Sequence, residues 1–130
     1  MFYSSNFSTN TAYTYISTPL MILTSATDSN TLDELCSAGN FADQWAEELD
    51  TVTRNMIATK PSLGMYVVNC PFHVAVVYPN SYQEMEVPLI DTNNVGEKMV
   101  LRDLLANFVR GTKPYQAIDD VTSKNPKCVE

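Results

Sequence analysis

Apolar residues recur every three or four positions in residues 40–58, the clearest periodic stretch of the chain. The apolar residues that make this pattern are Phe41, Trp45, Leu49, Val52 and Met56. They fall within about 80° of one another on a wheel that advances about 100° per residue. The polar residues on the opposite side are Asp43, Glu47, Asp50 and Arg54. The pattern predicts an amphipathic helix with a buried aromatic stripe and a mostly acidic face toward water.

A second amphipathic helix is predicted over 97–110. Its apolar stripe consists of Val100, Leu101, Leu104, Leu105, Phe108 and Val109. Gly111 follows as a natural helix end, because glycine readily adopts the left-handed conformation of a C-terminal cap. Thr31 and Glu34 have the spacing of a capping box, in which each side chain satisfies a backbone donor of the first turn. This motif predicts a short helix over 31–38.

Runs of β-branched and aromatic residues predict strands over 13–24, 65–69, 72–78 and 83–90, and a short last strand from 113 onward. The resulting order, β-α-α-β-β-β-α-β, favours a single α+β domain. We expect an antiparallel or mixed sheet of about four strands with the two main amphipathic helices packed on one face. Polar composition predicts a flexible N-terminal arm over 1–11 and a mobile C-terminal tail over 119–130, with the domain between them at 12–118.

Charge is distributed unevenly along the 130 residues. The chain has 15 acidic and 8 basic residues, for a net charge of −7, and Arg54 is the first base. The acids before it are Asp28, Asp33, Glu34, Asp43, Glu47, Glu48 and Asp50. Because the remaining eight acids balance the eight bases, the whole net charge arises in 28–50. No basic stripe is present for nucleic-acid phosphates or anionic membranes, whereas a basic partner protein is electrostatically allowed.

The chain contains three cysteines and one histidine. An odd number of cysteines, behind an N-terminus unlike a secretion signal, predicts free thiols in a reducing cytoplasm. Cys70 and His73 form only half of a zinc-binding set, and no second pair has the spacing of a zinc site. With four glycines and no phosphate-cradling loop, we expect neither a metal nor another cofactor.

Residues 72–78, with the sequence FHVAVVY, resemble the histidine strand of papain-like peptidases and amidases. The resemblance implies a cysteine hydrolase with Cys36 as the nucleophile, His73 as the base and Asp91 as the group that orients the imidazole. Cys70 is an alternative thiol. The family's cysteine begins a long helix, whereas Cys36 lies late in the short predicted helix.

The segregation of charge favours a non-enzymatic interaction protein over the hydrolase. The predicted partner-binding residues are Asp33, Glu34, Asp43, Glu47, Glu48 and Asp50. Such an acidic face suits a basic or nucleic-acid-binding protein, which it would inhibit by occupying the groove for the nucleic acid, as small inhibitors encoded by phages and other mobile elements do.

A third interpretation is a virion or filament assembly subunit, since Ser, Thr and Asn are abundant and Lys is scarce. In that case residues 1–11 would pair with the sheet edge of a neighbouring subunit. The oligomeric state stays open, a homodimer included.

Overall fold

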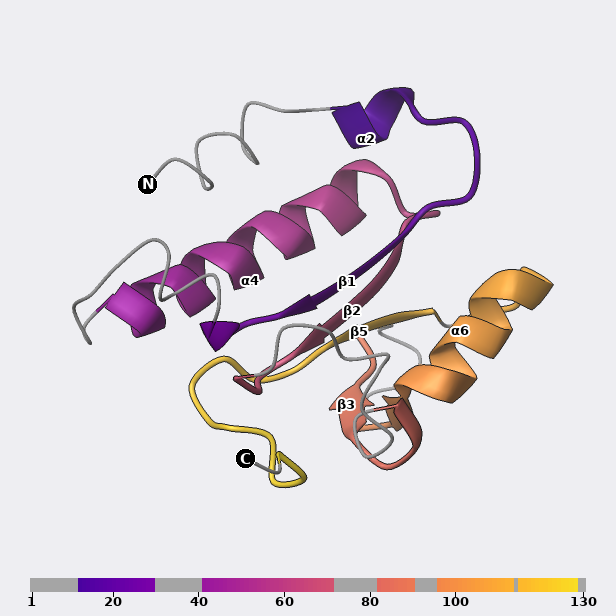
Figure 1. Ribbon diagram of the computed structural model, residues 1–130. Helices are drawn as coiled ribbons and strands as arrows, with labels where there is room; N and C mark the ends of the chain where they lie inside the picture. Colours follow the sequence, from indigo (N-terminus) through magenta and orange to yellow (C-terminus); the bar gives the residue numbers. More distant parts are fainter. Residues whose placement is uncertain (1–11, 30–40, 72–81, 91–95, 114, 129–130) are drawn as a thin grey trace.

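A computed structural model describes residues 12–29, 41–71, 82–90, 96–113 and 115–128 (Figure 1). The elements in chain order are α2 (Ala12–Tyr15), β1 (Met21–Ser25), α4 (Phe41–Thr59), β2 (Gly64–Val68), β3 (Glu86–Pro88), β4 (Lys98–Val100), α6 (Leu101–Arg110) and β5 (Gln116–Ile118). The mixture of helices and strands confirms the α+β class.

The strands form two sheets, so the expectation of one sheet of about four strands is wrong. One sheet has three parallel strands in the order β1-β2-β5, and the other pairs β3 with β4 in antiparallel fashion. An isolated antiparallel bridge between Leu89 and Ala117 links the two sheets. The parallel arrangement follows from the connection between β1 and β2, because a crossover that contains a long helix returns the chain in the same direction.

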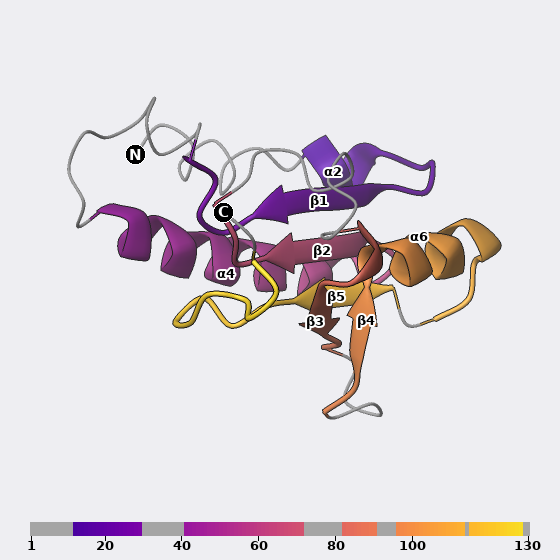
Figure 2. The same cartoon turned by 60° about the horizontal axis from the view of Figure 1, so that its bottom comes forward.

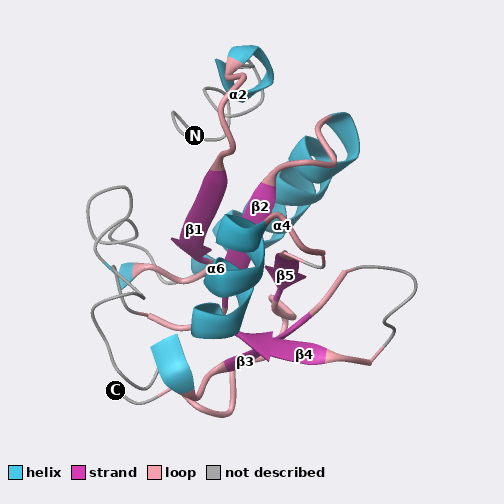
Figure 3. Ribbon diagram, turned by 90° about the vertical axis from the view of Figure 1, so that its right-hand side faces the viewer, coloured by secondary structure: helices cyan, strands magenta, loops and turns pink. Residues whose placement is uncertain are grey.

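The two long helices lie on opposite faces of the three-stranded sheet, which corrects the expectation that they share one face. Met65 and Val67 of β2 pack in the cluster that contains the buried side chains of α4. Tyr66 and Val68, which point the other way, pack with Leu101 and Leu104 of α6. Figure 3 shows α6 in front of β2 and α4 behind it. The five residues of β2 are all buried because the strand is covered on both faces.

Helix α4 confirms the strongest sequence prediction. It spans Phe41–Thr59, and Trp45, Leu49 and Met56 are buried while Val52 is half-buried. The inward stripe is therefore the one that the periodicity predicts, and Asp43, Glu47 and Asp50 lie on the opposite, outer side of the helix.

Helix α6 is shorter at its start than predicted, because residues 98–100 pair with β3 as strand β4. Its end is as predicted: Gly111 adopts the left-handed conformation, with φ 69°, and its backbone N–H donates to the carbonyls of Asn107 and Phe108. The predicted strand over 13–24 is confirmed only in its second half, as β1, because 12–15 form the short helix α2. The predicted helix over 31–38 and the predicted strand over 72–78 lie outside the described residues.

Residues 119–128, which the sequence assigns to a mobile tail, pack against the ends of the strands. In Figure 2 this segment continues from β5 as a loop beside the sheet. It is joined to the core by a disulfide between Cys70 and Cys128, whose Cα atoms are 5.6 Å apart. The prediction of free thiols is therefore wrong for these two cysteines. The sequence of 119–128 has no periodic apolar positions from which this packing could have been predicted.

Candidate functional site

The carboxyl ends of β1, β2 and β5 meet at one end of the parallel sheet, and a polar side chain stands at each. Ser25 closes β1, Asn69 follows β2, and Asp119 follows β5. All three are buried. Ligands of open parallel sheets bind at this end, so it is the first place to examine for a functional site.

The carboxylate of Asp119 is held by two hydrogen bonds. Its Oδ2 accepts from the backbone N–H of Asn69 at 3.1 Å and from Nδ2 of Asn125 at 2.8 Å. The side chain of Asp119 is only 7% exposed, and a buried carboxylate is tolerated when donors of this kind surround it.

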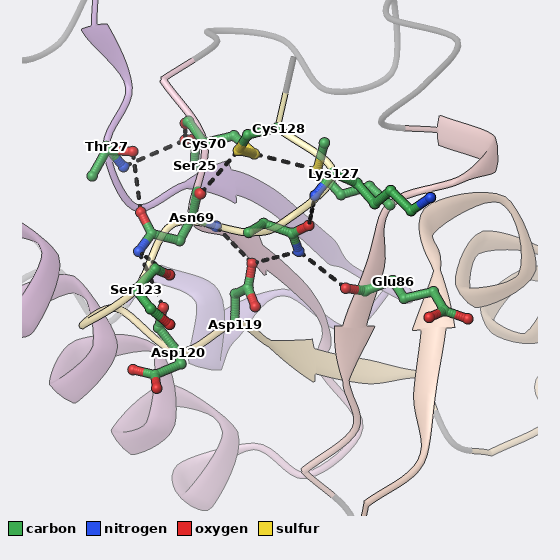
Figure 4. Close-up of a disulfide and its surroundings, with 12 residues drawn as sticks. Ser25, Thr27, Asn69, Cys70, Glu86, Asp119, Asp120, Ser123, Lys127 and Cys128 are labelled. Carbon is green, nitrogen blue, oxygen red and sulfur yellow. Dashed lines mark hydrogen bonds between the residues drawn. A yellow bond between two sulfur atoms is a disulfide. The ribbon is translucent and has the colours of Figure 1, made fainter. Parts of the chain in front are cut away.

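The side-chain amide of Asn69 joins three segments of the chain (Figure 4). Its Nδ2 donates to the carbonyls of Asp120 at 3.1 Å and Ser123 at 2.8 Å, and its Oδ1 accepts from the Thr27 hydroxyl at 3.2 Å. The Ser25 hydroxyl donates to the carbonyl of Cys70. We call Ser25, Thr27, Asn69, Asp119 and Asn125 the carboxyl-end network.

These hydrogen bonds are made within the protein, so the carboxyl-end network is arranged to hold the segment 119–128. Sequence reasoning missed its members. The only available signal was position: Asn69 ends a predicted strand, and Asp119 directly follows the apolar pair Ala117 and Ile118.

Two residues near this network have shifted pKa values. The exposed carboxylate of Asp120 accepts hydrogen bonds from the Thr122 hydroxyl and then from the Thr122 backbone N–H, and both lower its pKa. Burial raises the pKa of the Tyr66 hydroxyl, and the negative charge of Asp119 raises it further. Both effects favour the protonated, neutral form of Tyr66.

The disulfide excludes Cys70 as a free nucleophile while the bond is intact. Its sulfur is buried, and Sδ of Met85 lies 3.4 Å from it. The proposed hydrolase residues Cys36, His73 and Asp91 all lie outside the described residues, so the arrangement implied by the papain-like resemblance stays a prediction. Among the residues that are described, no group of three or more metal-ligating side chains occurs.

Asp43, Glu47 and Asp50 lie on the outer side of α4, and Glu48 lies at the edge between this side and the apolar stripe. Asp43, Glu47 and Glu48 are exposed, while Asp50 is half-buried and its carboxylate accepts from Nε of Arg54 at 2.9 and 3.0 Å. We call Asp43, Glu47, Glu48 and Asp50 the acidic face of α4. The predicted partner-binding residues Asp33 and Glu34 lie outside the described part of the chain.

Interactions within α4 account for two of the four carboxylates of its acidic face. Asp43 lies in the first turn of α4, where a carboxylate favours the helix dipole, and Asp50 pairs with Arg54. Glu47 and Glu48 are beyond the first turn, and within the described ranges neither has an ion-pair partner. Four acids against one base give this surface a formal charge of −4 + 1 = −3.

No helix in the described ranges combines the length and the apolar character that a membrane span requires. Comparison with protein-family models, curated proteins and solved structures finds no match to this chain.

Proposed function

We propose that the protein is a non-enzymatic interaction module that binds a basic protein through the acidic face of α4. The observation that carries the proposal is the pair Glu47 and Glu48: two exposed carboxylates on a rigid helix, with no ion pair in the described part of the chain and no role in starting the helix.

The rigidity of α4 favours binding of a basic protein to its acidic face. The inner side of α4 is fixed by Trp45, Leu49 and Met56 in the core, so little backbone entropy is lost when a partner binds the outer side. Exposed carboxylates steer a basic partner and select against acidic ones, and salt weakens the attraction beyond a screening length of about 8 Å at physiological ionic strength. A nucleic-acid-binding protein suits this surface, because its basic groove already accepts spaced negative charges.

The test is a capture experiment with a matched charge control. The bait variant Glu47→Lys/Glu48→Lys reverses the acidic face of α4. The control variant Glu84→Lys/Glu97→Lys makes the same change in net charge at two exposed positions beside the β3–β4 sheet, across the three-stranded sheet from α4.

We expect wild type and the control variant to capture the same basic proteins from a lysate of the source cells, and the α4 variant to lose them. If both variants lose them equally, only net charge matters, and if the α4 variant keeps them, the acidic face of α4 is not the binding surface.

A further inference from the structure

The segment 119–128 is attached to the core by a polar anchor and by a covalent one, at different positions. The polar anchor is Asn125, which is 3% exposed. Its Nδ2 donates to the carbonyl of Glu86 at 3.0 Å as well as to Asp119, and its backbone N–H donates to the carbonyl of Asn69 at 3.0 Å. The covalent anchor is Cys128, three residues further along.

Asn125 also fixes the position of Cys128. Its Oδ1 accepts from the backbone N–H of Lys127 at 3.0 Å, and its backbone carbonyl accepts from the N–H of Cys128 at 2.9 Å. These bonds close a tight turn that brings Sγ of Cys128 to Cys70, and to 3.2 Å from the carbonyl oxygen of Asn69 (Figure 4). The two sulfur atoms are therefore held together by the fold as well as by their own bond.

The two cysteines differ in their exposure to solvent. Cys70 is fully buried among apolar residues, whereas Cys128 is partly exposed. An attacking thiolate therefore reaches Cys128, and Cys70 must leave as a thiolate in apolar surroundings that disfavour its charge. This asymmetry makes reduction slow in the folded protein but leaves one route open for it.

We propose that the segment 119–128 is attached to the core in two independent stages, and we call it the clasp. The Cys70–Cys128 bond is its redox-sensitive attachment, and Asn125 is the residue that positions that bond. Oxidation locks 126–128 against the core. Reduction releases 126–128 and frees the Cys70 thiol, while Asn125 keeps 119–125 in place. The clasp thus switches its last residues without unfolding the sheet.

The reductant is a dithiol. One of its thiolates attacks Sγ of Cys128, a mixed disulfide forms, the Cys70–Cys128 bond breaks, and Sγ of Cys70 takes up a proton. The second thiolate of the reductant then attacks the reductant sulfur of the mixed disulfide. Sγ of Cys128 leaves and takes up a proton, and the reductant becomes a cyclic disulfide. Two electrons pass to the protein.

Hydrogen exchange of single amides distinguishes the two stages. The experiment uses the full chain with Cys36→Ser, so that only Cys70 and Cys128 titrate, and compares the oxidised protein with protein in excess dithiothreitol. We expect the Cys128 amide to exchange at least about tenfold faster after reduction, because its hydrogen bond to Asn125 frays. The Asn125 amide, bound to the carbonyl of Asn69, should accelerate no more than the amides of β2, which report the loss of global stability.

Two results would overturn the clasp. If the Asn125 amide accelerates as much as the Cys128 amide, and more than the amides of β2, the segment opens as one unit and Asn125 is not a separate anchor. If neither accelerates, the disulfide controls no local opening.

The positioning role of Asn125 has its own readout, the ratio of reduced to oxidised dithiothreitol at which half of the disulfide is lost. We expect Asn125→Ala to lower this ratio by about tenfold or more, the effect of losing a net hydrogen bond. Thr122→Ala, in the same segment but bonded only to Asp120, should leave the ratio within about twofold. An unchanged ratio in Asn125→Ala would refute the positioning role, and if that variant fails to fold, amide exchange in the wild-type segment still decides the clasp.

Discussion

Loss of the Cys70–Cys128 disulfide should destabilise the whole domain, and the size of the effect follows from the length of chain that it closes. The two cysteines are separated by 58 residues. In the chain-entropy model such a loop lowers the entropy of the unfolded chain by about 14 cal/mol/K, or about 4 kcal/mol at 25 °C. For a chain of this size that free energy corresponds to a fall in Tm of about 15 °C.

The variant Cys70→Ala/Cys128→Ser tests this figure, because it removes both sulfur atoms without leaving a thiol in the core. Urea unfolding is followed by the fluorescence of Trp45, the single tryptophan, which lies on the buried side of α4. The matched control is Cys36→Ser, which removes a cysteine but not this bond. We expect a loss of about 3–5 kcal/mol in the double variant and an unchanged midpoint in the control.

A loss below about 1 kcal/mol in the double variant would refute the reasoning, because it would mean that the unfolded chain gains little freedom when the bond is absent. The same variant in the presence of dithiothreitol should unfold as it does without the reductant. Wild type should approach the double variant only when its disulfide is reduced.

Two further predictions concern the core and the C-terminal segment. Gly64→Ala should destabilise the fold by about 1–3 kcal/mol in urea unfolding, because the added Cβ would lie 2.8 Å from Cδ2 of the half-buried Phe108 ring, which would have to move. A loss below about 0.5 kcal/mol would contradict this packing. The hydrogen bonds from Thr122 lower the pKa of Asp120, so they stabilise the folded state above the unfolded pKa of this carboxyl, and the contribution is lost as pH falls through the lowered pKa. Thr122→Ala removes the hydroxyl donor and keeps the backbone N–H, so it should raise the pKa of Asp120 part of the way toward its ordinary value in an NMR titration. An unchanged titration would show that the bond from the hydroxyl does not form in solution.

The sequence predicts the parts of the fold that local patterns determine. The stripe of Trp45, Leu49 and Met56 identifies α4, and Gly111 identifies the end of α6. Strand β2 follows from the β-branched and aromatic residues of 65–69. These elements are recognisable because each buries a face whose period is set by its own backbone geometry.

The arrangement of these elements depends on contacts between residues far apart in the chain. Strand alternation places Met65 and Tyr66 on opposite faces, but nothing within 65–69 shows which helix covers each face, so the sequence could not place the two helices. Likewise, the segment 119–128 is held by a few single contacts, such as those of Asn125 and Cys128, rather than by an apolar stripe. A disulfide between residues 58 positions apart gives no local signal.

Asp43, Glu47 and Asp50 of the acidic face of α4 were predictable for the same reason as the helix itself, since they occupy the side opposite the apolar stripe. Glu48 lies beside the stripe, about 100° around the helix from Glu47, and is exposed. What periodicity could not supply is which carboxylates are engaged within the protein. The structure shows Asp50 paired with Arg54 and leaves Glu47 and Glu48 exposed, which makes these two glutamates the residues to change.

The central claim is that Glu47 and Glu48 contact a basic protein, and the most direct measurement is the Kd of a captured, purified partner as a function of salt concentration. We predict that wild type and Glu84→Lys/Glu97→Lys bind with Kd values that rise with salt in parallel. Glu47→Lys/Glu48→Lys should bind at least about tenfold more weakly at low salt and depend less steeply on salt. Equal Kd values and equal salt dependence for all three proteins would contradict the claim.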